Sequence, residues 1–389
     1  MSSSPQNNMT HHCKRLGWAT WIVAATLALS AATGLVRAGQ TGLVFVGSGH
    51  KNISAFWLDM TTGALRPIGE VAQMEAPSFI ATSPNRKFLY AVAEGNRAER
   101  SFVNAFRIDL QTGKLTALNR MLTGGSGPCH VSVDQKGKAV LVANYGSGSV
   151  SVFPIDKDGA LEPMSAFVQD RGASIDPQRQ QGPHAHCFLT DPGNRFAFAC
   201  DLGLDKIMVF KFDPAKGLLA ANDPPFASVK PGAGARHIAF DANARHAYVS
   251  DEMASTVTAF AYDRQRGVLS EIEDYSLLPK DFKGQNTAAE VAVHPSGKSV
   301  YASNRGDNSI VVFGCDPDTG RLTFIERDST GGKTPRNFEI DPSGSFLLAA
   351  NQDSGTVVVF SIDKKTGRLQ PTGNTVESDT PMCVICLKE

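Results

Sequence analysis

Apolar and polar residues alternate along most of this chain in short runs that are separated by turn residues. The stretch from Gly182 to Phe210, GPHAHCFLTDPGNRFAFACDLGLDKIMVF, shows the whole pattern. A proline precedes a first alternating run, a DPGN turn follows, a second run ends on an aspartate, and a third run begins after a short break. Alternation with a period of two is typical of strands, so the stretch predicts three consecutive antiparallel strands.

The same unit recurs at intervals of about 50 residues, which is the repeat length of a four-stranded propeller blade. Each unit continues with a third run, such as residues 149–155 or 356–362, then a tight turn and a fourth strand. The first strands begin at Pro77, Pro128, Pro183, Ala235, Ala288 and Pro335. The repeat therefore predicts an all-β protein built from four-stranded blades.

The two ends of the repetitive region complement each other. The segments LVFVGSG, ISAFWLD and ALRPIGE, from residue 43 onward, supply strands two, three and four of a unit but no first strand. Residues 381–387, PMCVICL, supply a first strand and nothing after it. Joining them makes a seventh blade and leaves no open sheet edge. We therefore expect residues 39–389 to form one seven-bladed β-propeller domain, its ring closed by the C-terminal strand.

The first 38 residues do not follow this repeat. Lys14 and Arg15 precede an uncharged stretch, residues 16–36, which ends in Val36-Arg37-Ala38. Small residues at these places suit signal peptidase, so residues 1–38 indicate a secretory signal and a periplasmic or secreted protein. An uncleaved membrane anchor is the alternative, because about 20 apolar residues can also span a bilayer.

Composition narrows the range of partners. The chain has 38 basic and 38 acidic residues among 389, so no overall charge favours nucleic acid or a membrane surface beyond the possible anchor. Six cysteines follow residue 38, and most lie in alternating apolar runs, where a buried thiol is the common role. Cys383 and Cys386 form a CxxC, but residues three apart on a strand face opposite sides. We expect no metal and no cofactor.

Polar residues gather where the first strand of a unit begins and the second ends, and both places open on the same rim of a propeller. Three arginines of this rim, Arg236, Arg305 and Arg336, would point toward one cavity and would need a compensating anion. We therefore expect the rim to carry a site for a small anionic substrate. Glu252 and Glu290 are the alternative means of neutralising the arginines. By contrast, His246 and His294 lie in the turns of the opposite rim, where we expect them to be solvated. The site rim carries His184, His186, Arg236, His237, Glu252, Glu290, Asn304, Arg305 and Arg336.

At these residues the chain resembles the seven-bladed lactonase family, which includes 6-phosphogluconolactonase and the fungal carboxy-cis,cis-muconate cyclase. The motifs that carry the resemblance are GPHAH (182–186), DLGLDKI (201–207), GARH (234–237), SNRG (303–306) and TPRNF (334–338). The resemblance implies lactone hydrolysis, with catalytic residues His184, Arg236, Glu252 and Arg305. His186, His237, Glu290, Asn304 and Arg336 are the expected substrate-binding residues.

The sequence contains no GxSxG motif and no nucleophilic serine or cysteine beside a base, so direct attack by water is expected. Either Glu252 or His184 could be the general base, and the arginines would stabilise the oxyanion. Two other functions stay open. The arginines would equally suit cycloisomerisation of an unsaturated diacid, and an exported propeller can bind a ligand or surface partner without catalysis. An exported lactonase would meet unphosphorylated sugar lactones, and the oligomeric state is undetermined.

Overall fold

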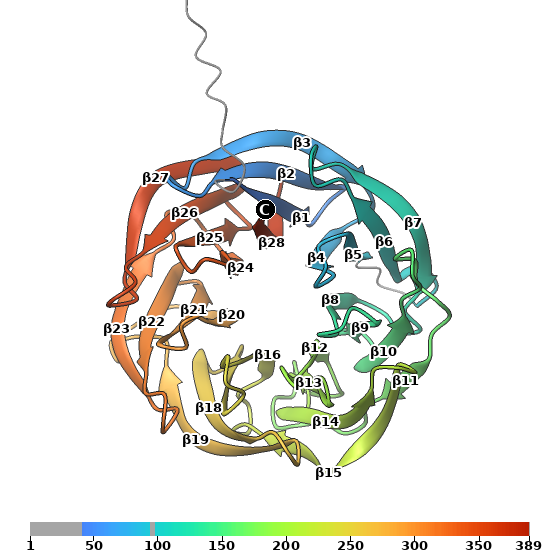
Figure 1. Ribbon diagram of the computed structural model, residues 1–389. Coiled ribbons are helices and arrows are strands. Elements are labelled where there is room, and N and C mark those ends of the chain that lie inside the picture. The colour runs from blue at the N-terminus through green and yellow to red at the C-terminus, as the bar shows by residue number, and fades with distance from the viewer. Residues whose placement is uncertain (1–40, 94–97, 389) are drawn as a thin grey trace, which may run out of the picture. The chain divides into compact units, whose positions relative to one another are not determined.

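The computed structural model describes residues 41–93 and 98–388, and these residues form seven four-stranded antiparallel sheets arranged as blades around a central axis (Figure 1). The predicted all-β, seven-bladed propeller is confirmed. The predicted signal segment, residues 1–38, lies outside the described residues. Among the residues that are described, no helix is long and apolar enough to cross a bilayer.

Six blades take four consecutive strands each, from the inside of the ring to the outside. Blade 1 contains β4 (Pro77–Thr82), β5 (Phe88–Ala93), β6 (Phe102–Ile108) and β7 (Leu115–Leu122), with the short 3-10 helix η1 (Ala98–Arg100) before β6. Blade 2 contains β8 (Pro128–Val133), β9 (Ala139–Asn144), β10 (Ser149–Pro154) and β11 (Ala166–Gln169). Blade 3 contains β12 (Ala185–Thr190), β13 (Phe196–Asp201), β14 (Lys206–Asp213) and β15 (Leu218–Ser228).

The next three blades repeat this order. Blade 4 contains β16 (Ala235–Phe240), β17 (His246–Asp251), β18 (Thr256–Asp263) and β19 (Val268–Ser276). Blade 5 contains β20 (Thr287–Val293), β21 (Ser299–Arg305), β22 (Ser309–Cys315) and β23 (Leu322–Ser329). Blade 6 contains β24 (Pro335–Ile340), β25 (Phe346–Asn351), β26 (Thr356–Ile362) and β27 (Leu369–Glu377).

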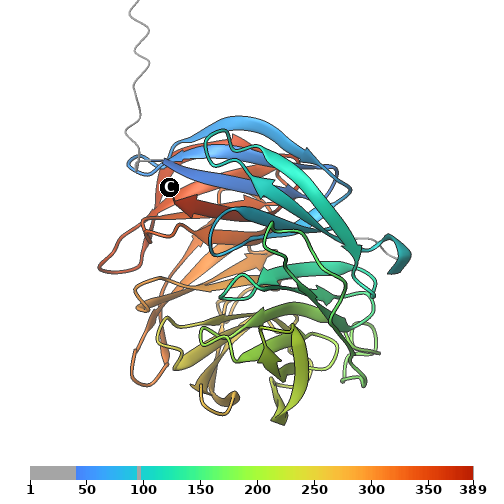
Figure 2. The ribbon, with the colours of Figure 1, turned by 45° about the vertical axis from the view of Figure 1, so that its right-hand side comes forward.

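Blade 7 is built from both ends of the chain. It contains β28 (Pro381–Lys388), β1 (Thr41–Ser48), β2 (Asn52–Asp59) and β3 (Leu65–Gln73), in that order. β28 pairs antiparallel with β1, and Leu387 lies opposite Leu43. Figures 1 and 2 show the red C-terminal strand beside the blue N-terminal strands. The predicted ring closure is confirmed, and it pairs both sheet edges that would otherwise be open.

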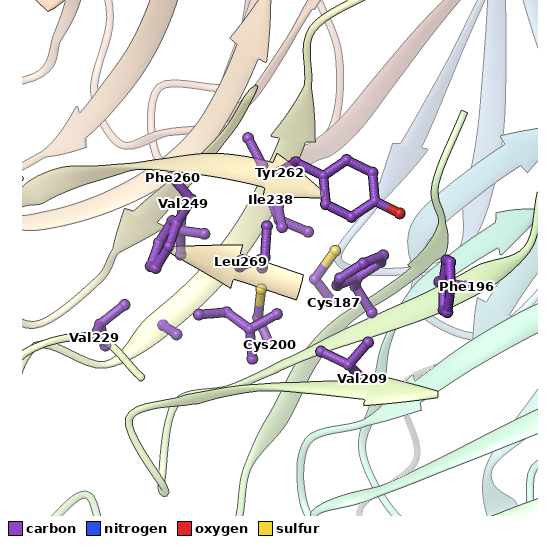
Figure 3. Packing of buried hydrophobic residues seen from close by; sticks show 14 of the residues in the cluster. Cys187, Phe196, Cys200, Val209, Val229, Ile238, Val249, Phe260, Tyr262 and Leu269 are labelled. Carbon is purple, nitrogen blue, oxygen red and sulfur yellow. The ribbon is translucent and has the colours of Figure 1, made fainter. Parts of the chain in front are cut away.

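The hydrophobic core lies mainly between neighbouring blades. One cluster joins Phe198 and Cys200 of blade 3 to Val249 and Phe260 of blade 4, and all four side chains are buried (Figure 3). Apolar side chains on both faces of each sheet therefore pack against the adjacent sheets. Burial of one such aromatic ring contributes about 2–3 kcal/mol. The packing fixes each blade, and with it the polar groups at its inner strand.

The cysteines follow the expected pattern of buried thiols. Cys187, Cys200, Cys383 and Cys386 are all buried. Cys383 packs in the cluster between blades 7 and 1, whereas Cys386 packs in the cluster between blades 6 and 7. The prediction that the two residues of the CxxC face opposite sides of their strand is confirmed.

The turns that join strands one and two lie on the rim opposite the predicted site. Asp191 is buried in such a turn, where its carboxylate accepts the backbone N–H groups of Gly193, Arg195 and Phe196. The prediction that His246 and His294 are solvated was wrong, because both are buried. His246 hydrogen-bonds Asp241 of its own turn, whereas His294 hydrogen-bonds Ser296 of its own turn and the Gly344 carbonyl of blade 6.

Candidate active site

The inner strand of each of blades 1 to 6 has a β-bulge near its start, on the rim of the predicted site. The pairing register between the first and second strands shifts there and leaves one residue, or two in β20, without an opposite partner. Bulges are known to re-aim a side chain beside active sites. The residues at the shifts are Ser78, Cys129, His186, Arg236, Ala289, Glu290 and Arg336.

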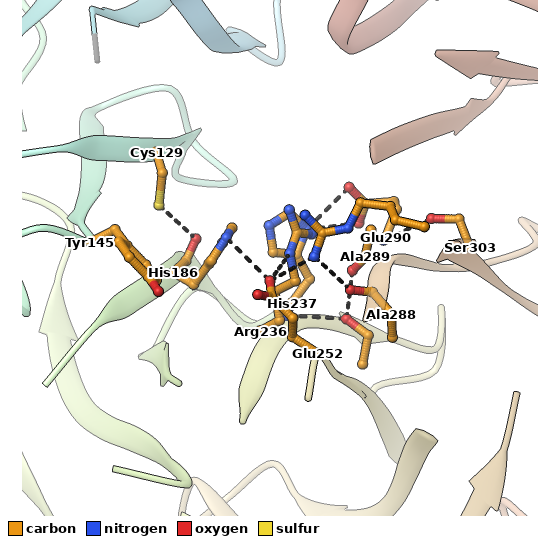
Figure 4. Close-up of polar contacts among 12 residues, drawn as sticks. Cys129, Tyr145, His186, Arg236, His237, Glu252, Ala288, Ala289, Glu290 and Ser303 are labelled. Carbon is orange, nitrogen blue, oxygen red and sulfur yellow. Dashed lines mark hydrogen bonds and ion pairs between the residues drawn. The ribbon is translucent and has the colours of Figure 1, made fainter. Parts of the chain in front are cut away.

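Glu252 is the centre of the polar cluster on this rim. It follows β17 directly, and its backbone is fixed because its N–H donates to Gly234 O and its carbonyl accepts from Ala288 N–H. Its carboxylate lies 2.8 Å from a terminal nitrogen of Arg179, 3.1 Å from Arg236 Nε and 2.8 Å from a terminal nitrogen of Arg305. Three guanidinium groups from different parts of the ring thus meet one carboxylate. Figure 4 shows Arg236 and His186 beside Glu252.

The arginines set the charge of Glu252. Burial alone would raise the pKa of this carboxyl, but Arg305, Arg236 and Arg179 outweigh burial and lower the pKa to about 2. The carboxylate is therefore ionised at neutral pH. A group with so low a pKa accepts a proton poorly, so the electrostatics argue against Glu252 as the general base.

The arginines retain hydrogen-bonding capacity. Arg236 is almost fully buried, and burial together with Arg305 and Arg336 lowers its pKa to about 9, so it is still charged at pH 7. Its Nη1 is buried without an acceptor, and so is Nε of Arg305. One terminal nitrogen of Arg305 donates to Ala288 O. Buried N–H donors without acceptors are rare in proteins, and two of them beside one carboxylate indicate a place for a ligand oxygen.

His186 is the histidine nearest to Glu252, with 4.0 Å between its Nε2 and Oε2 of the carboxylate. Burial and the neighbouring positive charges of Arg236 hold its pKa well below the ordinary value, so the ring is neutral. Its Nδ1 is buried without a partner. The sequence placed His184 beside Glu252 and His186 in a binding role, whereas it is His186 that approaches the carboxylate.

His184 lies at the edge of the cluster, partly exposed. Its backbone N–H donates to Asp201 Oδ1, and a Cβ at Gly203 would clash with the Gly182 carbonyl, so only glycine fits this close approach. The ring stacks on Tyr145, and its Nδ1 is 2.9 Å from Tyr145 O. A carbonyl only accepts hydrogen bonds, so Nδ1 carries a proton, and the other ring nitrogen, Nε2, is the one that can act as an acceptor.

A second carboxylate and histidine lie further inside. His237 Nδ1 is 2.9 Å from Glu290 Oε1, and Asn337 donates to the other oxygen of Glu290. Burial favours the neutral carboxyl, but His237 and Arg236 outweigh it and lower the pKa of Glu290 to about 2. The ring of His237 lies 5.2 Å from that of His186. Within the described ranges no group of three or more His, Cys, Asp or Glu side chains is arranged to hold a metal ion.

Two expected binding residues occupy different environments. Asn304 is buried, and its amide donates to Leu277 O and Ser309 Oγ and accepts from Asn286. Its side chain therefore braces the blade 5 turns, and a substrate contact for Asn304 is disfavoured. Arg336 lies at the bulge of β24, close enough to lower the pKa of Arg236 through its charge.

Sequence reasoning missed two residues of the cluster, Arg179 and Tyr145. Arg179 lies in the connection between β11 and β12, where one terminal nitrogen reaches both Tyr145 Oη, at 3.0 Å, and Glu252. This connection does not follow the repeat, so no periodic signal marks its residues. Tyr145 directly follows Asn144, the last residue of β9, and the sequence offered no reason to single it out.

An open cleft of about 940 Å³ lies apart from this cluster, over blade 7. Its charged lining is Lys51, Glu70, Glu75 and Asp379, so three carboxylates face one lysine, and none of its lining residues is an arginine. Acidic side chains disfavour an anionic ligand there. The convergence of guanidinium groups therefore marks the rim around Glu252, and not this cleft, as the candidate site for an anion.

Comparison with known proteins agrees with this architecture. The family model described as "Lactonase, 7-bladed beta-propeller" matches residues 43–386. A 6-phosphogluconolactonase from Bacillus subtilis is 38% identical over 279 residues, which cover 72% of this chain and 78% of the relative. Another, from Formosa agariphila, is 36% identical over 276 residues, which cover 70% of this chain and 77% of the relative.

A solved structure shows the same likeness in three dimensions. The periplasmic gluconolactonase of Pseudomonas aeruginosa matches with a TM-score of 0.83 and 31% sequence identity, covering 89% of this chain and 99% of its own. The fold, the family match and the curated relatives agree with one another. The chain belongs to the seven-bladed β-propeller lactonase family.

Proposed function

We propose that this protein hydrolyses sugar lactones at the rim around Glu252. The observation that carries the proposal is the pair of buried N–H donors without acceptors, Arg236 Nη1 and Arg305 Nε. At the edge of the same cluster, His184 stacks on Tyr145, whose hydroxyl contacts Arg179. Family membership supports it, since relatives at 36–38% identity are 6-phosphogluconolactonases.

The arginines would stabilise the charge that forms during reaction. When water adds to the lactone carbonyl, negative charge develops on the carbonyl oxygen. Guanidinium donors held in place beforehand stabilise such an oxyanion without reorganising. In this proposal Glu252 holds both Arg236 and Arg305 in position through one oxygen, Oε2, and it does not itself exchange a proton.

His184 is the proposed general base. Its Nε2 takes a proton from water as the water oxygen bonds to the carbonyl carbon. The tetrahedral intermediate then collapses, the ring C–O bond breaks, and the imidazolium returns its proton to the leaving alkoxide. The product is an open hydroxy acid, and the histidine regains its starting state.

The same arginines would also suit cycloisomerisation of an unsaturated diacid. A pH-stat assay with gluconolactone separates the possibilities, because hydrolysis releases one acid per turnover. We expect wild-type protein to exceed the spontaneous rate and His184→Gln to fall near it. A wild-type rate equal to background would reject hydrolysis and favour a non-catalytic binder. In a separate ultraviolet assay, loss of the absorbance of a muconate substrate would identify the lyase.

The signal-like pattern of residues 1–38 supports export to the periplasm or to the outside of the cell. A similar protein, the gluconolactonase of Pseudomonas aeruginosa, is periplasmic. Fractionation of cells that express the full chain, followed by N-terminal sequencing, tests both export and cleavage after Ala38.

A further inference from the structure

The segment between β11 and β12, residues 170–184, holds an arginine over the site from outside the repeat. The segment is anchored through side chains: the amide of the buried Gln180 donates to Leu202 O and Asp205 Oδ1, and the Ser174 hydroxyl donates to the other oxygen of Asp205. Asp205 also accepts the N–H groups of Gly232 and Gly234, just before the strand that carries Arg236. The segment is therefore tied to the same scaffold as the buried arginine.

Arg179 differs from the other two arginines of the cluster in exposure. Its side chain is 41% exposed, against 2% for Arg236 and 14% for Arg305. All three contact Glu252. The buried pair needs this carboxylate, because a buried charge without a partner is strongly destabilising. Arg179 can exchange Glu252 for another anion at little expense, because water already reaches it.

The cluster has more positive charge than its one carboxylate neutralises. Arg179, Arg236 and Arg305 share Glu252, which leaves two positive charges in excess. Glu290 and Arg336, which also act on Arg236, are opposite in sign and offset each other. An anionic ligand would remove this excess. The oxyanion proposed above forms only during reaction, so the ground state would be matched by an ionised group on the substrate itself.

We propose that Arg179 selects lactones that carry an ionised phosphate or carboxylate substituent, by turning from Glu252 to bind that substituent while Arg236 and Arg305 face the reacting carbonyl. The anchored backbone of residues 170–184 confines the movement to the side chain. The planar guanidinium suits either anion, because it donates two parallel hydrogen bonds. This inference rests on the proposed lactone hydrolysis and adds its substrate class.

The test compares three lactones: a neutral sugar lactone, its phosphate ester and a carboxylate-bearing counterpart. The variants are Arg179→Gln, Arg179→Lys and, as the matched control, Arg171→Gln, which removes an exposed arginine from the same segment. We expect Arg179→Gln to reduce the ratio of kcat/KM for ionised over neutral lactone about tenfold or more, mainly through KM. Arg171→Gln should leave that ratio unchanged, and Arg179→Lys should fall between.

The two anionic substrates identify which group Arg179 binds, since only the matching ester or acid should lose its advantage. Equal losses of kcat/KM on neutral and ionised lactones in Arg179→Gln would overturn the proposal and leave Arg179 a structural role. A wild-type protein with no preference for either ionised lactone would overturn it as well.

A binding measurement separates this inference from the proposed reaction. Inorganic phosphate should raise the thermal midpoint of wild type and Arg171→Gln, and raise that of Arg179→Gln less. If wild type hydrolyses no lactone but phosphate stabilises Arg179→Gln less than the other two proteins, the proposed hydrolysis is wrong and the proposed anion contact of Arg179 is supported. If lactones are hydrolysed but phosphate stabilises all three proteins equally, the reaction stands and the role of Arg179 fails.

Discussion

The two rims of the propeller are both polar, yet they use their polar groups in opposite ways. On the turn rim, the Asp191 and Asp341 carboxylates are each satisfied by backbone N–H groups two to five residues along the same chain segment. On the site rim, Glu252 is satisfied by side chains from distant segments, and its partners keep unused donors. Polar groups that close on themselves build turns, whereas groups that meet across blades with donors left over build a site.

The largest expected difference between the rims is the loss of activity when a buried arginine of the site rim is replaced. Arg236→Gln removes a buried guanidinium from the site and should lower kcat/KM for lactone hydrolysis about 100- to 1000-fold, the usual effect of losing one oxyanion donor. Steady-state kinetics on folded protein measure it, with folding checked by circular dichroism. A kcat/KM within about threefold of wild type would contradict the assignment of Arg236 to the site.

Glu252→Gln tests whether the site is held together by its carboxylate. The change leaves Arg236 and Arg305 buried without a countercharge, which should reduce the free energy of unfolding by about 3 kcal/mol at pH 7. Urea unfolding measures this loss. A variant as stable as wild type would mean that the arginines are not held by Glu252.

The pH dependence of stability follows from the same carboxylate. Its pKa is lowered from 4.5 to about 2, so between these values the folded protein binds fewer protons than the unfolded chain. The free energy of unfolding should therefore fall as the pH drops from 4.5 toward 2, and this part of the loss should be missing in Glu252→Gln. Burial raises the pKa of Asp251 to about 7, which acts in the opposite direction but is common to both proteins.

The turn rim should show stability effects without catalytic ones. Asp191→Ala deprives three backbone N–H groups of their acceptor and should cost about 1–3 kcal/mol of stability. The kcat/KM per folded molecule should not change, since the turn lies on the rim opposite Glu252. A selective loss of activity in this variant would remove the distinction between the rims.

The smallest effect is expected from an exposed arginine on the turn rim. Arg245 is 48% exposed at its side chain and contacts Asp318 and the Pro317 carbonyl. Arg245→Gln should change stability by less than about 0.5 kcal/mol and leave kcat/KM unaltered. It is the matched control for Arg236→Gln, and a large activity loss here would show that arginine substitutions act nonspecifically.

The sequence was sufficient for the architecture because period-two alternation and the blade repeat are local and redundant. Ring closure could be predicted because residues 381–387 and the segment from Leu43 each lack what the other supplies. Strand starts were correct at Pro77, Pro128, Ala235 and Pro335, and shifted by one or two residues where β12 and β20 begin. Those shifts do not change the fold, because pairing within each blade sets the register.

The site could be predicted only in part, since its geometry depends on features that the repeat does not encode. The bulge in β12 directs His186 toward Glu252, and an alternating pattern gives no sign of a bulge. Arg179 lies in an aperiodic connection, so its contact with Glu252 follows only from the folded segment. The proposal of His184 rather than Glu252 as the base rests on the three arginine contacts of Glu252. These contacts form only when blades 3, 4 and 5 are assembled, so the sequence alone does not show them.

A crystal structure with the product sugar acid bound tests the central claim most directly. The account predicts the new carboxylate within hydrogen-bonding distance of Arg236 Nη1 and Arg305 Nε, with His184 Nε2 facing it. A product bound instead in the cleft lined by His50 and Glu70, or one that leaves both arginine donors without a contact, would contradict the account.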